Sequence, residues 1–197
     1  MKGDRKCSSR DFYRFLMNDN PDFFLRKALE LAGDFHPVDC PTEEDWEFLE
    51  REIGVTLPVE HKQFVSRFGS GRFGDDLYLL NPRAKGAGQL SANALQNYAA
   101  QTALLLAEMP RRVYPDGTLI LLATTTSRLD WFMDGTEPKG LVFFDLGIYR
   151  VFNLPFTFAE FVCKLYTGEL NYDWEESVKK TIWSGDDAPF FKPMTNL

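Results

Sequence analysis

Residues 42–74 read TEEDWEFLEREIGVTLPVEHKQFVSRFGSGRFG, and this stretch decides the predicted fold. Thr42 can cap a helix, and the three acids that follow it would lie in the first turn, where the positive end of the helix dipole stabilises them. The next apolar residues recur at the spacing of one helix face: Trp46, Leu49 and Ile53. Gly54 supplies a stop, so the pattern predicts a helix between Thr42 and Gly54.

A second helix is predicted after a short joint. Pro58 fits the first position of a helix, because its missing N–H would have no partner there. The apolar residues after it again share one face: His61, Phe64, Val65 and Phe68. Gly69 ends this helix and begins a glycine-rich connection to the apolar run at 77–80, which we expect to be a strand.

The following residues predict one longer helix and then a run of strands. Residues 90–109 are rich in Ala and Leu and end before Pro110, which favours a helix. Short apolar segments follow, separated by turn signals such as Asp134-Gly135: 119–123, 129–133, 141–144 and 148–152. Because these separations suit hairpins, this part predicts an antiparallel meander.

The predicted boundaries divide the chain into three parts. Residues 1–38 form an N-terminal extension with helical spacing, which Asn20-Pro21 breaks into two short helices. Residues 39–169 form the main domain, and its closing helix begins at a Thr-x-x-Glu capping box made by Thr157 and Glu160. Residues 170–197 contain many aromatic residues beside prolines and acids, so we expect this segment to pack on the domain.

Composition bounds the class of protein and its partners. The 197 residues include 22 Lys and Arg against 29 Asp and Glu, a net charge of −7 with a pI near 4.9. Apolar residues are 44% and charged residues 26%, which are ordinary globular values and argue against a mostly disordered chain. The sequence has neither the overall basic charge typical of nucleic-acid-binding proteins nor a polybasic membrane anchor. We therefore expect neither nucleic acid nor a membrane as a partner.

Localisation is predicted from the apolar runs and the cysteines. The longest apolar run, at 119–123, has the length of a strand rather than of a membrane span. Residues 1–14 lack the hydrophobic core of a secretory signal. The cysteines are odd in number and scattered: Cys7, Cys40 and Cys163. Together these features predict reduced thiols in a cytoplasmic protein.

The sequence contains only weak matches to the motifs of cofactor-binding and catalytic sites. Residues 69–74 match G-x-G-x-x-G, but a helix is predicted before them and a strand after them, the reverse of a dinucleotide site. His36 and Cys40 have no second pair of ligands, and His61 is on an apolar helix face, which favours packing. With no G-x-S-x-G elbow either, we expect no catalytic residue, no metal and no cofactor.

A partner-binding surface is the remaining possibility. Acids beside Trp and Met suit a surface that combines charged steering with apolar anchors. The candidate partner-binding residues are Asp75, Asp76, Asp130, Trp131, Asp134, Asp186 and Asp187. For 130–134 the alternative is the alternation of a half-buried strand, and for the paired acids it is a solvated loop.

The order of these elements resembles the SUKH superfamily, the Smi/Knr-type group of bacterial immunity proteins and fungal cell-wall regulators. The resemblance runs over residues 40–168. It comprises an acidic helix, the Gly54-Val55-Thr56-Leu57-Pro58 joint, a second helix with Phe64, and the glycines of 69–74. Residues 141–145 resemble the central strands of the family, and 156–161 resemble its closing helix. His61 and Phe68-Gly69-Ser70 depart from the common pattern.

The resemblance implies an α+β domain, with helices packed on a mainly antiparallel sheet, and a non-enzymatic binding role. Bacterial members typically neutralise a cognate toxin, often a nuclease, and an acidic protein could occupy the basic cleft of such an enzyme. The alternatives are a regulatory scaffold of the same fold, and an enzyme or ligand-binding domain with an acidic pocket. The implied partner is therefore a protein, expected to be a toxin domain with a basic surface.

Overall fold

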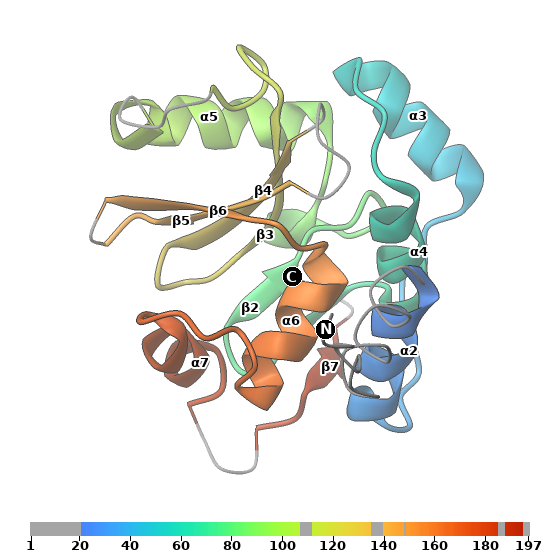
Figure 1. The fold of residues 1–197 in the computed structure, drawn as a ribbon. Coiled ribbons are helices and arrows are strands. Elements are labelled where there is room, and N and C mark those ends of the chain that lie inside the picture. Colours follow the sequence, from blue (N-terminus) through green and yellow to red (C-terminus); the bar gives the residue numbers. More distant parts are fainter. Residues whose placement is uncertain (1–20, 107–111, 135–139, 148, 185–187, 195–197) are drawn as a thin grey trace, which may run out of the picture.

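The chain forms a seven-stranded sheet with helices on both faces (Figure 1). The computed structural model describes residues 21–106, 112–134, 140–147, 149–184 and 188–194. The strands lie in the order β6-β5-β4-β3-β2-β1-β7, and every neighbouring pair is antiparallel. Their bounds are β1 (Gly71–Phe73), β2 (Leu77–Leu79), β3 (Leu119–Thr124), β4 (Leu129–Asp134), β5 (Leu141–Asp145), β6 (Arg150–Leu154) and β7 (Phe191–Pro193). This architecture confirms the predicted α+β class with a mainly antiparallel sheet.

Helices cover the two faces unequally. Their bounds are α2 (Pro21–Ala32), α3 (Glu43–Ile53), α4 (Val59–Phe68), α5 (Ala92–Leu106), α6 (Phe158–Thr167) and α7 (Glu175–Ile182), with a 3₁₀ turn η1 (Gly86–Gly88). Figure 1 shows α5 on one side of the strands and α6 and α7 on the other. α2 packs against α6, and α3 lies next to α5. None of the helices that the structure describes is both long and apolar enough to cross a membrane.

Strand β4 shows how both faces of the sheet become buried. Successive strand residues point to opposite faces. Trp131 stacks on Phe143 with ring centroids 5.0 Å apart, on the face that α6 covers. Phe132 faces Tyr98 of α5 at 6.1 Å. Every residue of β4 is therefore buried, instead of alternating between buried and exposed.

Strand β1 lies within the predicted glycine-rich connection of residues 69–74, where no strand was expected. Gly71 pairs with Leu79 of β2 on one side and with Pro193 of β7 on the other. A Cβ at Gly71 would lie 2.3 Å from the Phe191 ring and 2.6 Å from the Lys192 carbonyl oxygen. The glycine is needed because a second strand approaches closely there.

Helix caps follow the sequence with one difference. At α3, Thr42 and Asp45 form a complete capping box, in which each side chain accepts from the backbone N–H of the other residue. At α6, Thr157 accepts from the backbone N–H of Glu160 at 3.2 Å. The Glu160 carboxylate binds Lys164 at 2.8 Å, one turn further along the helix. The reciprocal half of the predicted Thr157–Glu160 box is thus replaced by an ion pair.

Gly69 provides a test of backbone geometry. Its φ is +70° and ψ is −149°, and a Cβ there would lie 2.0 Å from the Val38 carbonyl oxygen. Gly69→Ala is expected to lower the free energy of unfolding by about 2–3 kcal/mol, through strain and the clash. Gly54→Ala is the matched control, because its φ is +67° but no atom lies within 4 Å of the added Cβ. Urea denaturation measures both, and equal losses would contradict the role of the clash.

Candidate functional site

The structure buries three of the predicted partner-binding residues. Asp130, Trp131 and Asp134 are 1%, 0% and 3% exposed. Strand β4 lies inside the sheet, with β3 and β5 beside it and helices over both faces. The prediction that these side chains form a partner surface is therefore wrong, and so is the alternative of a half-buried strand.

Asp130 instead joins helix α5 to the sheet. The Tyr98 hydroxyl donates to one carboxylate oxygen at 2.5 Å, and the Thr124 hydroxyl donates to the other. Burial raises the pKa of Asp130, and these two hydrogen bonds partly oppose that rise. Asp134, four residues along the same strand, accepts from the Thr118 hydroxyl at 3.1 Å. The acids of β4 thus have structural partners.

Asp75 and Asp76 lie at the surface but also bind within the chain. The Asp76 carboxylate accepts from the backbone and hydroxyl groups of Thr126 and Ser127, which lie in the turn between β3 and β4. Asp75 accepts from the Ser184 hydroxyl at 2.9 Å. Asp76 therefore holds the turn between β3 and β4, and Asp75 holds the segment after α7. Asp186 and Asp187 lie outside the described residues.

A different acidic surface follows helix α3. Seven acids and one base in residues 39–54 make this segment strongly negative. Because Trp46, Leu49 and Ile53 face the core, the opposite face of α3 presents acids and Phe48 to solvent. Phe48 is 57% exposed, which is unusual for a large apolar side chain in this protein.

This face borders a groove of about 300 Å³ between α3 and the beginning of α5, hereafter the acidic groove. Its lining comprises Glu44, Asp45, Phe48, Leu49 and Glu52 of α3 with Pro82 and residues 89–93. Glu44 and Glu52 flank Phe48 at four-residue spacing, and neither has an ion pair among the described residues. An apolar side chain between two unpaired carboxylates suits a ligand that carries both positive charge and apolar surface.

Local contacts hold the acidic groove in shape. The Glu50 carboxylate accepts from the Leu57 N–H at 2.7 Å and pairs with Lys62 at 3.2 Å, which ties α3 to α4. The Asp45 carboxylate is bound at the helix N-terminus, where the Thr42 N–H lowers its pKa. The Arg51 guanidinium lies 5.5 Å from the Phe48 ring centroid. The sequence signal for this surface was the charge count of 39–54.

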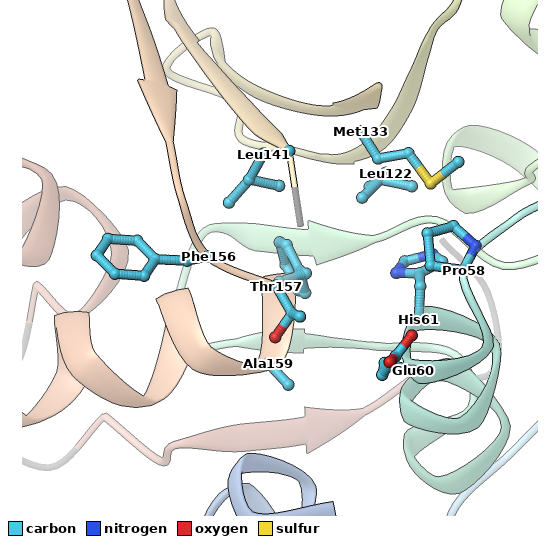
Figure 2. Close-up of a pocket in the computed structure, with 11 residues that line it drawn as sticks. Pro58, Glu60, His61, Leu122, Met133, Leu141, Phe156, Thr157 and Ala159 are labelled. Atoms are coloured by element: carbon cyan, nitrogen blue, oxygen red, sulfur yellow. The ribbon is translucent and has the colours of Figure 1, made fainter. Parts of the chain in front are cut away.

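A second feature is a small cavity at His61, hereafter the His61 cavity, with a volume of about 30 Å³. Figure 2 shows His61 rising from the first turn of α4 toward Leu122 and Met133 of the sheet, with Thr157 at the beginning of α6 beside it. His61 is 6% exposed, and neither ring nitrogen has a hydrogen-bond partner among the described residues. Burial lowers the pKa of His61 to about 4.

Metal-ligand groups and thiols are considered among the described residues. No group of three or more His, Cys, Asp or Glu side chains gathers there as a metal centre would require. Cys40 and Cys163 are free thiols. Burial raises the pKa of Cys163 to about 12, so this thiol is unreactive at neutral pH.

Comparisons with known proteins add no relative. No protein-family model matches the chain, and no curated protein or solved structure matches it. Function is therefore argued from the geometry above.

Proposed function

We propose that the chain is a non-enzymatic binding protein of the SUKH type, an immunity protein that neutralises a toxin by holding it in the acidic groove. The observation that carries the proposal is Phe48, an exposed aromatic ring between Glu44 and Glu52 at the edge of that groove. Aromatic side chains supply most of the binding energy in many interfaces, and charges around them set the association rate.

The partner that fits this surface is a basic protein domain. A nuclease toxin binds phosphates with a cleft of Lys and Arg side chains. Glu44 and Glu52 could pair with such side chains, while Phe48 occupies an apolar position between them. Occupying the cleft would exclude the nucleic acid substrate, so inhibition needs no catalytic group on this chain.

Charge reversal in the acidic groove is the direct test. Glu44→Lys with Glu52→Lys changes the net charge from −7 to −3, since each substitution adds two charges. With the partner captured from the cells that make this protein, we expect association at low salt to slow by about tenfold or more. Asp34→Lys with Asp173→Lys makes the same change at exposed positions outside the groove and should slow association far less. Equal slowing by the two pairs would refute the groove as the interface.

The same capture separates an immunity protein from a scaffold. Captured proteins are identified by mass spectrometry, and each is then expressed alone in a test bacterium. A toxin partner stops growth, and co-expression of the wild-type chain restores it while the Glu44→Lys, Glu52→Lys variant does not. If only housekeeping or envelope proteins are retained, the immunity proposal fails and the regulatory scaffold is favoured.

A further inference from the structure

The His61 cavity lies where two helices begin. Pro58, Glu60 and His61 at the start of α4 form one side, and Thr157, Phe158 and Ala159 at the start of α6 form the other (Figure 2). The first N–H groups of a helix have no acceptor within the helix, and the helix dipole gives this end a positive potential. The two helices have 10 residues each, so both dipoles are well developed.

Neither helix fully caps these groups itself. Pro58 occupies the N-cap position of α4 and makes no side-chain cap hydrogen bond. At α6 the Thr157 hydroxyl oxygen accepts from Glu160 only, which is the third residue of the helix. Two uncapped or half-capped helix ends thus meet at one cavity, an arrangement that favours an anion and disfavours a cation.

His61 supplies an independent sign of a ligand. A buried polar group without a hydrogen bond is costly, and His61 has two such nitrogens in the described structure. Trp46 and Phe158 lie edge-on to the imidazole at 6.3 and 6.4 Å, so the ring is held in place beside the cavity. A ligand that accepts a hydrogen bond would satisfy a ring nitrogen without moving the core.

We propose that the His61 cavity binds a small monovalent anion of halide size, held by His61 and the first turns of α4 and α6. The cavity volume of about 30 Å³ sets the size. A buried water needs about 10–15 Å³, so the space has room for one ion of halide size. This site uses different residues from the acidic groove and stands apart from the proposed function.

The protonation state of His61 makes anion binding at the cavity dependent on pH. Among the described residues that line the cavity, Glu60 is the one acid, and it is only half-buried, so water screens its carboxylate. Apart from Thr157, the residues that the sheet and the α6 side contribute carry no polar side chain: Leu122, Met133, Gly140, Leu141, Phe156, Phe158 and Ala159. An anion therefore favours the imidazolium form of His61, and protonation in turn strengthens anion binding.

The coupling between His61 protonation and anion binding sets how strongly anion affinity depends on pH. The pKa of His61 is about 4 when the site is empty. If only the imidazolium form binds, apparent anion affinity rises about tenfold for each pH unit of acidification, until the pH reaches the pKa of the empty protein. The same linkage raises the apparent pKa of His61 when anion is added.

Histidine NMR on the full chain tests the proposal without a mutation. The Cε1–H signals of His61 and of exposed His36 are followed from neutral to mildly acidic pH, in sodium chloride and in sodium gluconate at equal ionic strength. Gluconate is too large for the cavity, so chloride is the probe. We expect chloride to raise the His61 midpoint by about one pH unit or more while the His36 midpoint stays the same. Equal His61 midpoints in the two salts would mean that the cavity holds only water, and would overturn the proposal.

Two variants sharpen the result. Glu60→Gln should enlarge the chloride-dependent change of the His61 midpoint, because the neutral amide no longer repels the anion. His61→Phe should abolish the dependence of thermal unfolding on chloride against gluconate, whereas His36→Phe should preserve it. A chloride effect that survives in His61→Phe, or that shifts both histidines equally, would indicate general salt screening and contradict the site.

Discussion

Replacing Phe161 with Ala is expected to lower the free energy of unfolding by about 3–5 kcal/mol. Phe161 is fully buried in α6, with its ring 5.6 Å from that of Trp131 and 6.5 Å from that of Trp174. It therefore joins the sheet to the segment that carries α7. Removing the ring loses its transfer free energy and leaves a cavity, because strands on both sides of β4 prevent collapse around it. For a chain of 197 residues the melting temperature should fall by about 10 °C.

Phe48→Ala is the matched control for this loss. It removes the same ring from another helix, but Phe48 is 57% exposed, so the expected cost is below about 1 kcal/mol. Guanidinium denaturation of the two variants and the wild type measures both. A loss of similar size in both variants, or an unchanged midpoint for Phe161→Ala, would contradict the packing of α6 on the sheet.

Phe48→Ala is also a test of partner binding, because it removes the exposed ring of the acidic groove. It should speed dissociation of the partner about tenfold.

Local sequence signals predicted α3, α4 and α6 well, because residues at or next to their ends mark where each helix starts and stops, whereas helix α7 (Glu175–Ile182) was not predicted. α3, α4 and α6 end where Gly54, Gly69 and Gly168 adopt positive φ values of +67°, +70° and +74°. These glycines could be recognised as helix ends from the sequence, although the approach of Val38 that also requires a glycine at position 69 could not. The short strands β1 and β7 were not predicted; each has three residues, and β7 pairs with β1 across about 120 positions of sequence, as at Arg72 and Lys192.

The candidate surface was harder to predict for the same reason. Asp130, Trp131 and Asp134 have the composition of a binding surface, but their burial depends on Tyr98 and Thr118 in other elements. Local pattern cannot show which helix covers a strand. The sequence analysis did not choose the acidic face of α3 as the partner surface, although helical periodicity places Glu44, Phe48 and Glu52 on the side away from the buried Trp46. Helical periodicity can thus show the exposed face of α3, but not that Pro82 and residues 89–93 lie beside it to form the groove.

Acid is expected to destabilise the protein through His61, in the absence of a bound anion. Its pKa is about 4 in the folded chain and about 6.5 in the unfolded chain. The unfolded state therefore takes up the proton first. The stabilisation is fully present above about pH 6.5 and is lost as pH falls toward 4, a total change of about 3 kcal/mol. Carboxylates also titrate in this range, and the raised pKa of Asp130 acts in the opposite direction, so the His61 contribution has to be isolated by a variant.

His61→Phe isolates that contribution. Phenylalanine cannot take up a proton, and it can keep the edge-on contacts with Trp46 and Phe158 while removing two unpartnered polar atoms. Its unfolding free energy at neutral pH should equal or exceed that of the wild type. Measured by urea denaturation in gluconate, the difference between variant and wild type should grow by about 3 kcal/mol as pH falls from 6.5 to 4. His61→Leu serves as a second variant if the larger ring overpacks the cavity. Parallel pH profiles for all three proteins would contradict the lowered pKa of His61. They would show that the imidazole is solvated in the folded chain and that the cavity at the two helix ends is open to water.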